Sequence, residues 1–229
     1  MAIYPGKSDR AECEPRPQYY KRDFWSEENL KYSGPHFRLR KSAMLINELS
    51  GEAECDLLDV GCGPATLQTL LRPNIRYYGI DIAIQGAADN LLEVDILESQ
   101  IRFGDHKFGI VVAQGLFEYL GDQQRTKLAE ISQIVEPNGT FLTSYVNFGH
   151  RRRNIYWPYS NIMPISDFKR ELSEWFVIDR VVPTSHNWRH NEPSRRVIRS
   201  INMHLNARFP LITPKLAVEY FFICTPRRT

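Results

Sequence analysis

The sequence has few cysteines and no long hydrophobic run, and each absence excludes a class of protein. Its four cysteines fall in no CxxC or Cys/His spacing, so neither a zinc site nor a disulfide framework is expected. No apolar run approaches the roughly 18 residues that a membrane-spanning helix needs. The amino-terminal segment has no apolar core of the kind found in secretory signals. We therefore expect a cytoplasmic protein with reduced cysteines, no metal and no membrane association.

The composition is that of an ordinary globular chain. It is 42% hydrophobic and 24% charged, which excludes wholesale disorder, collagen and coiled coil. At 229 residues, the chain fits one large domain or one domain with a smaller addition.

Charge is unevenly distributed along the chain. Residues 1–149 carry 15 Lys and Arg against 21 Asp and Glu, whereas residues 150–229 carry 14 against 6. The basic carboxyl-terminal third could attract an anionic substrate or an acidic partner, or it could be a solvated arginine-rich face. Nucleic-acid binding is less favoured, because the positive residues are widely spread and follow no recognised module.

Short apolar runs alternate with amphipathic segments through most of the chain, which predicts right-handed βαβ crossovers. The expected strands are 57–60, 77–81, 91–95, 108–113, 140–146, 176–182 and 217–225. The expected helices are 37–50, 65–71, 123–135 and 165–175, with a turn at 137–139. The fold class is therefore α/β, with a doubly wound, Rossmann-like, mainly parallel seven-stranded sheet.

The strongest motif is LLDVGCGPA at 57–65, an apolar strand that turns through Gly61 and Gly63 toward a helix. Ligands of open α/β sheets bind at this edge, and glycines let the backbone come close to them. Two acids sharpen the motif: Asp59 precedes the first glycine, and Asp81 ends the next strand.

These acids help to distinguish between cofactors. A nicotinamide dinucleotide requires GxGxxG, but Thr66 occupies the third glycine position and Asp59 would lie near the phosphates. S-adenosylmethionine has no phosphate, and it carries a ribose diol, an ammonium and a sulfonium. Asp81 could accept both ribose hydroxyls, Asp59 could lie near the ammonium through water, and Asp95 could accept from the adenine amino group. The alternative is that the acids only solubilise loop ends.

The motifs together resemble the class I S-adenosylmethionine-dependent methyltransferases. LLDVGCGPA resembles their first motif, YYGIDIA (77–83) their ribose-binding motif and EVDI (93–96) their adenine-binding segment. FGIVVAQGLFEYL (108–120) and EISQIVEPNGTFLTSYVN (130–147) are similar to the later strands and helices. The resemblance implies S-adenosylmethionine as cofactor and S-adenosylhomocysteine as product. The cofactor-binding residues that it implies, together with the reasoning above, are Arg40, Asp59, Gly61, Cys62, Gly63, Asp81, Ile82, Asp95, Ile96, Gln114 and Gly115.

A closer resemblance is to the methyltransferase-like family called methionine biosynthesis protein W. The segments that carry it are 144–151, 159–162, 166–168 and 210–212, with Glu219. Residues 183–209 are longer and more basic than that family leads us to expect. We expect residues 1–36 to form a leader and a helical lid. Residues 37–229 would form the methyltransferase domain, with a basic, substrate-side insertion at about 147–214 before the last strand.

The resemblance also suggests how the ends of the cofactor are covered. Tyr20 and Trp25 lie where related enzymes have a lid, although helix-on-sheet packing explains such aromatics equally well. Arg40 would bind the methionine carboxylate through its guanidinium fork, and Arg38 is the competing choice.

Several residues are candidates for the acceptor side. His150, at the end of the fifth strand, is the best candidate for a general base, although it could instead order the following loop. Glu118 could be merely solvent-facing. The acceptor pocket could be walled by aromatic and histidine side chains, or these could be packing residues: Tyr20, Trp25, Tyr119, Tyr145, Tyr156 and His186.

We therefore expect a methyltransferase acting on an oxygen or nitrogen of a small molecule, which the basic third would suit if that molecule is anionic. The alternatives are a cofactor-binding regulatory or partner subunit without turnover, and a modifier of RNA or protein. The sequence is compatible with self-association but does not specify it.

Overall fold

The computed structural model describes residues 37–84, 86, 88–147, 163–186 and 217–227, together with residues 22, 23 and 26. Its strands are β1 (Cys55–Val60), β2 (Ile75–Asp81), β3 (Leu91–Glu93), β4 (Phe108–Gln114), β5 (Val135–Val146), β6 (Phe176–His186) and β7 (Ala217–Pro226). Its α-helices are α2 (Phe37–Ser50), α3 (Gln124–Ile134) and α5 (Ile165–Trp175), and its 3₁₀ turns are η2 (Thr66–Leu70), η3 (Phe117–Tyr119) and η4 (Gly121–Gln123).

The strands form one sheet in the order β3-β2-β1-β4-β5-β7-β6. The first five strands of this order run parallel, and β7 lies antiparallel between β5 and β6. The sequence-based prediction of a mainly parallel, seven-stranded α/β sheet is therefore confirmed. The expected leader, most of the expected lid and most of the expected basic insertion lie outside the described residues.

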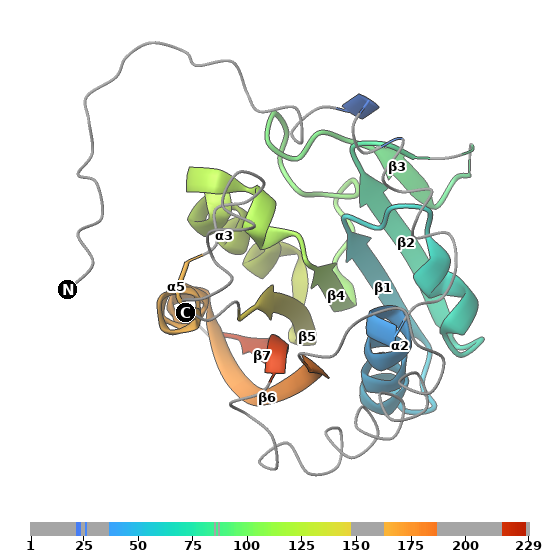
Figure 1. The fold of residues 1–229 in the computed structure, drawn as a ribbon. Helices are drawn as coiled ribbons and strands as arrows, with labels where there is room; N and C mark the ends of the chain where they lie inside the picture. Colours follow the sequence, from blue (N-terminus) through green and yellow to red (C-terminus); the bar gives the residue numbers. More distant parts are fainter. Residues whose placement is uncertain are drawn as a thin grey trace, which may run out of the picture.

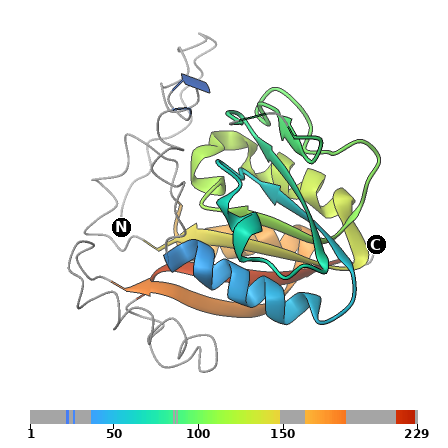
Figure 2. The ribbon, with the colours of Figure 1, turned by 90° about the vertical axis from the view of Figure 1, so that its right-hand side faces the viewer.

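Helices cover both faces of the sheet and divide the core into two layers. Helices α3 and α5 lie on one face, and α2 lies on the other (Figures 1 and 2). The first layer contains Leu128 of α3 and Phe168 of α5, and the second contains Leu45 and Ile46 of α2. The central strand β4 is buried almost throughout because both of its faces are covered, as expected for a parallel sheet.

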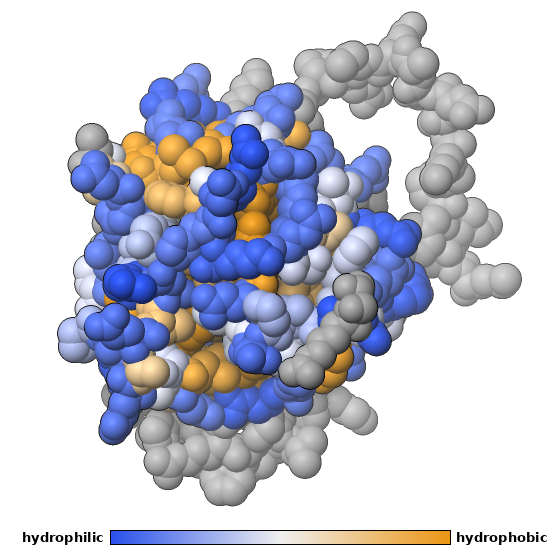
Figure 3. Space-filling model, turned by 180° about the vertical axis from the view of Figure 1, so that it is seen from behind, coloured by the Kyte–Doolittle hydropathy of each residue, from blue (hydrophilic) through white to orange (hydrophobic). Residues whose placement is uncertain are grey.

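The surface of the described part is mostly hydrophilic, with separate apolar areas when it is seen from behind (Figure 3). The large hydrophobic side chains most exposed in that part are Leu92 and Val177, which lie on the edge strands β3 and β6. No helix of the described residues is long and apolar enough to cross a membrane. Cys55, Cys62 and Cys224 have free thiols.

The crossover after β1 differs from the expected helix. Residues 65–71 were expected to be helical, but they form only the five-residue 3₁₀ turn η2. Ala65 begins it in the left-handed region, with φ 53°, and Pro73 follows shortly after it. A proline disfavours helical geometry at the preceding residue, so little room remains for an α-helix. The described residues between β2 and β4 contain no helix either.

Strand β5 begins five residues earlier than expected. The expected turn at 137–139 lies inside it, where the register with β4 shifts between Phe108 and Ile110. A Cβ on Gly139 would lie 2.8 Å from the carbonyl oxygen of Gly109, so only glycine allows the two backbones to approach at this irregularity.

Phe168→Ala tests the core beneath α5. The Phe168 ring stacks on Tyr145 with centroids 4.0 Å apart, and it also contacts Phe117 and Phe222. Removing a fully buried ring should lower the free energy of unfolding by about 3–5 kcal/mol in urea titrations. The neighbouring exposed residue supplies the control, Lys169→Ala, which should change it by less than about 0.5 kcal/mol. Equal effects of the two changes would contradict this packing.

Candidate active site

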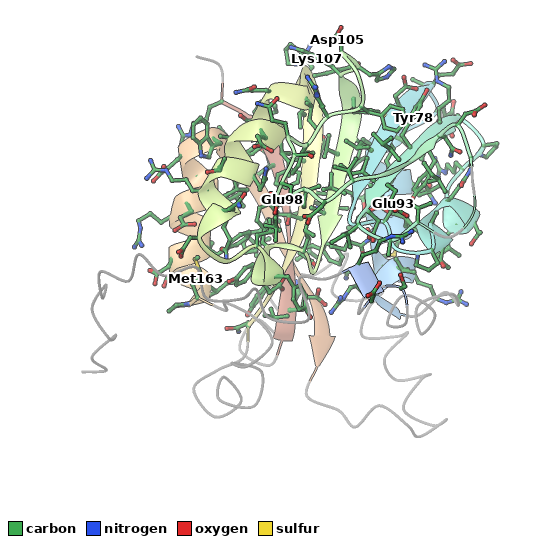
Figure 4. All side chains as sticks on the ribbon, turned by 90° about the horizontal axis from the view of Figure 1, so that it is seen from above. Tyr78, Glu93, Glu98, Asp105, Lys107 and Met163 are labelled. Atoms are coloured by element: carbon green, nitrogen blue, oxygen red, sulfur yellow. The ribbon has the colours of Figure 1, made fainter. Side chains whose placement is uncertain are left out.

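A pocket lies at the carboxyl edge of the parallel strands. Asp105 and Lys107, just before β4, lie at one end of the strands, and Met163, near the carboxyl end of β5, lies toward the other (Figure 4). The pocket is on the carboxyl side, and its walls come from the ends of β1, β2 and β4, from the segment after β3, from α2 and from η3. Ten of the residues expected to bind the cofactor line it: Asp59, Gly61, Cys62, Gly63, Asp81, Ile82, Asp95, Ile96, Gln114 and Gly115.

The floor of the pocket is the glycine turn after β1. Gly61 and Gly63 have φ of 77° and 53°, a region that residues with side chains rarely adopt. The N–H groups of Gly61 and Cys62 both donate to the carbonyl oxygen of Ile80, at 2.8 and 3.1 Å. A Cβ on Gly61 would lie 3.1 Å from Leu116. The glycines therefore allow both the turn and the close packing beside it.

The carboxylate of Asp81 is fixed by two backbone groups. Its Oδ2 accepts from the N–H of Gly63 at 2.8 Å, and its Oδ1 accepts from the N–H of Ala83 at 2.9 Å. These bonds hold both oxygens in one orientation at the pocket wall. An ionised carboxylate has about four acceptor positions, so a group in this place can also accept from the hydroxyls of a ligand.

Asp59 is almost completely buried beneath the same pocket. It accepts a hydrogen bond from the hydroxyl of Tyr77 at 2.8 Å. Burial raises the pKa of Asp59 to about 7, and the charge of Asp81 adds to this rise, while the Tyr77 bond opposes it. A cation in the pocket would favour the ionised form, so this carboxyl is suited to a positively charged ligand.

Two further acceptors lie in the wall. Asp95 follows β3, and its Oδ1 accepts from the N–H of Leu97 at 2.9 Å, which fixes the side chain in a turn. The side-chain oxygen of Gln114, at the end of β4, is buried and has no hydrogen-bond partner among the described residues. Such atoms are rare in folded proteins, and one in a pocket wall indicates a ligand donor.

Arg38, not Arg40, lies at the pocket. Among the described lining residues Arg38 is the only cation, and its Nε donates to Oε2 of Glu219 at 3.0 Å. Arg40, which the sequence analysis favoured, is exposed and does not line the pocket. Residues two positions apart on a helix point in nearly opposite directions, so only one of the two arginines can face the sheet edge.

The two described aromatic candidates lie in different places. Tyr119 lines the pocket. Tyr145 is fully buried in the core, where its hydroxyl accepts from the N–H of Met163 at 3.0 Å, because the end of β5 is covered on both faces. The other acceptor-side candidates lie outside the described residues: His150, Tyr20, Trp25, Tyr156 and the side chain of His186.

Two acids near the pocket were missed by the sequence analysis. Glu118 is not solvent-facing but buried, and burial raises its pKa to about 7. Its Oε1 accepts from the N–H of Val146 at 2.9 Å, and its Oε2 is buried with no hydrogen-bond partner in the described part of the chain. A glutamate between Phe117 and Leu120 in an apolar run was a signal of this burial. Glu219, which was noted only for a family resemblance, pairs with Arg38.

Asp59→Asn should remove a pH dependence of stability. The folded-state pKa is raised from 3.8 to about 7, so between these values the folded state binds more protons than the unfolded chain. The free energy of unfolding of the wild type therefore falls as pH rises through this window. Asparagine still accepts from Tyr77 and has no charge to bury. The difference in the free energy of unfolding between the variant and the wild type should therefore shift in favour of the variant by about 2–3 kcal/mol from pH 5 to pH 8.

Urea titrations at the two pH values measure this difference. The exposed substitution Glu52→Gln is the control and should follow the wild type at both. If Asp59→Asn also followed the wild type, the carboxyl would not be the buried titrating group.

The comparisons with known proteins identify the family of this chain. A model of the methyltransferase domain family matches residues 35–176, more than half of the chain. No curated protein matches the chain by sequence.

Solved structures with a similar fold come from several organisms. One is a chain of the complex between the Haloferax volcanii Trm112 methyltransferase activator and a methyltransferase, with a TM-score of 0.63, 16% identity, and coverage of 94% of this chain and 100% of that one. Another is the N-methyltransferase NodS from Bradyrhizobium japonicum WM9 in complex with S-adenosyl-L-homocysteine, with a TM-score of 0.56, 14% identity, and coverage of 89% of this chain and 99% of that one. A third is a SAM-dependent methyltransferase from Archaeoglobus fulgidus, with a TM-score of 0.58, 17% identity, and coverage of 90% of this chain and 100% of that one. The chain belongs to the methyltransferase domain family and has the fold of S-adenosylmethionine-dependent methyltransferases.

Proposed function

We propose that this protein is an S-adenosylmethionine-dependent methyltransferase that methylates an oxygen or nitrogen atom of a small molecule. The observation that carries the proposal is the excess of acidic over basic side chains in the pocket. Three acids, Asp59, Asp81 and Asp95, line it with a single cation, Arg38, among its described residues. A pocket of this kind suits a cationic nucleoside and repels a diphosphate.

The side chains present fit the parts of this cofactor. Asp81, with both oxygens oriented by backbone groups, would accept the two ribose hydroxyls. Asp95 would accept from the adenine amino group. Asp59 and the unpartnered oxygen of Gln114 would face the ammonium end, and Arg38 would face the carboxylate.

The turn after β1 argues against a dinucleotide. A pyrophosphate is bound by the N-terminus of a helix that follows a GxGxxG turn. Here the turn leads into the five-residue 3₁₀ segment η2, and Thr66 stands where the third glycine would be. Phosphates above Asp59 would raise its pKa further, and this buried carboxyl offers them no positive charge.

When bound, S-adenosylmethionine supplies an electrophilic methyl group on its sulfonium. The protein has to orient the acceptor against that group and exclude water. Leu116, Tyr119 and Leu120 form a largely apolar wall beside Gly115, where the acceptor would approach. His150 is our proposed base, and it is required only when the acceptor must lose a proton during transfer.

The proposal for the acceptor rests on the charge of the carboxyl-terminal third and on the expected lid and insertion. The basic carboxyl-terminal third favours an anionic acceptor, bound with the help of residues 1–36 as a lid and of the insertion at about 147–214. Tyr20, Trp25, Tyr119, Tyr156 and His186 would then contact it. Methyl transfer to a candidate acceptor, detected as S-adenosylhomocysteine release, tests this assignment.

A second candidate is a cofactor-binding subunit of a larger enzyme, in keeping with the resemblance to methionine biosynthesis protein W. One structural neighbour comes from a complex with the Trm112 activator. Co-purification of another enzyme without turnover by this chain would favour this second function. We place the protein in the cytoplasm in either case.

Asp81→Asn tests the ribose assignment by isothermal titration calorimetry. The wild type should bind S-adenosylhomocysteine and not NAD. Loss of a charge-assisted acceptor should weaken S-adenosylhomocysteine binding by about tenfold or more. Asp89 is exposed in the connection between β2 and β3. As the control, Asp89→Asn should bind like the wild type. A wild type that bound NAD and ignored S-adenosylhomocysteine would overturn the proposed function.

A further inference from the structure

A chain of polar contacts connects the pocket wall with the last strand of the sheet. The N–H of Gly115, after β4, donates to Oγ of Ser144 in β5 at 2.9 Å. Ser144 Oγ donates to Oε1 of Glu219 in β7 at 2.7 Å, and Arg38 Nε in α2 donates to Oε2 of the same carboxylate at 3.0 Å. The carboxylate of Glu219 in β7 thus bonds directly to β5 and α2, and through Ser144 to the residue after β4.

The Arg38–Glu219 pair is asymmetric in its exposure. The side chain of Glu219 is 3% exposed, whereas that of Arg38 is 30% exposed and lines the pocket. A buried carboxylate needs compensating donors, and here Ser144 and Arg38 supply them. The acid is the fixed, buried partner, and the guanidinium is the partner that reaches the ligand space.

Gly115 makes room for this guanidinium. A Cβ at this position would lie 2.8 Å from Nη1 of Arg38, so the guanidinium packs directly over the glycine. The contact with Glu219 uses Nε–H, which is one of the five donors of a guanidinium. The Glu219 carboxylate and the bare Gly115 backbone together restrict a long side chain that otherwise has many rotamers.

The order of the strands sets the direction in which a ligand lies. Along the carboxyl edge, β3, β2, β1 and β4 follow one another. Asp95 and Asp81 mark the β3 and β2 end, and Gly115 with Arg38 marks the β4 end. A nucleoside held by the two acids therefore extends its amino-acid part toward Arg38.

We propose that Glu219 is a positioning residue that aims the Arg38 guanidinium at the carboxylate of the amino-acid part of S-adenosylmethionine. This inference rests on the proposed function. It assigns to the last strand a role in cofactor binding, through an acid that does not itself line the pocket.

The test compares two ligands by isothermal titration calorimetry. S-adenosylhomocysteine carries the amino-acid part, and 5′-methylthioadenosine lacks it. Arg38→Ala should weaken S-adenosylhomocysteine binding by about tenfold or more and change 5′-methylthioadenosine binding by less than about twofold. Glu219→Gln should weaken S-adenosylhomocysteine binding by about three- to tenfold, again with 5′-methylthioadenosine unchanged.

Glu219→Gln separates positioning from simple charge pairing. If the acid only neutralised Arg38, its removal would leave a stronger cation and tighter S-adenosylhomocysteine binding. If it aims Arg38, the binding becomes weaker, because the amide keeps only one acceptor oxygen and cannot accept from both Arg38 and Ser144. Ser144→Ala should act in the same direction with a smaller effect. Retained 5′-methylthioadenosine binding shows that each variant is folded.

Three results would overturn the proposal. One is tighter S-adenosylhomocysteine binding by Glu219→Gln. The second is an equal loss of both ligands in Arg38→Ala. The third is a selective loss in Arg40→Ala and none in Arg38→Ala. A wild type that bound neither ligand would instead contradict the proposed function, so the two failures are distinguishable.

Discussion

The carboxylate of Asp81 joins the ends of two neighbouring strands, and the pocket depends on this tie. It accepts from Gly63 in the turn after β1 and from Ala83 just after β2. The turn is built from glycines in the left-handed region, which could otherwise adopt many conformations. One side chain thus fixes the backbone that forms the floor of the pocket and is itself oriented by it. A ligand that uses this carboxylate meets a group already in place, so little ordering remains at binding.

Two buried acids at and near the pocket carry an unfavourable electrostatic energy. Asp59 and Glu118 are fully buried, and burial raises the pKa of each to about 7. Among the residues that the structure describes, neither has a cationic side chain within hydrogen-bonding distance: Asp59 accepts from Tyr77, and Glu118 accepts from the backbone of Val146. Buried acids of this kind lower the free energy of unfolding of the ligand-free protein. A cation that enters the pocket would relieve part of that cost at Asp59. Such an arrangement is expected at a binding site, and a purely structural core has no need of it.

The strands could be predicted from the sequence because each is a short, locally encoded apolar run. The glycine turn and the acids at the strand ends were equally local, and ten of the residues expected to bind the cofactor line one pocket. Features set by chain geometry were less predictable. The apolar segment after Ala65 looks helical, but the left-handed residue before it and Pro73 after it leave room only for a 3₁₀ turn. Tyr145 looks like a pocket aromatic, but its place depends on α5 packing against its ring.

The choice between the arginines could not be made from the sequence because it depends on a distant strand. Arg38 and Glu219 are 181 residues apart, and β7 enters the sheet antiparallel to β5. Val146 lies opposite Glu219 in this register, and Ser144 lies two positions away on the same face. The amino end of β7 therefore lies beside the carboxyl end of β5. A parallel strand would place its first residues at the opposite edge of the sheet. Reversal of this one strand is thus what brings an acid from the end of the chain to the edge where ligands bind.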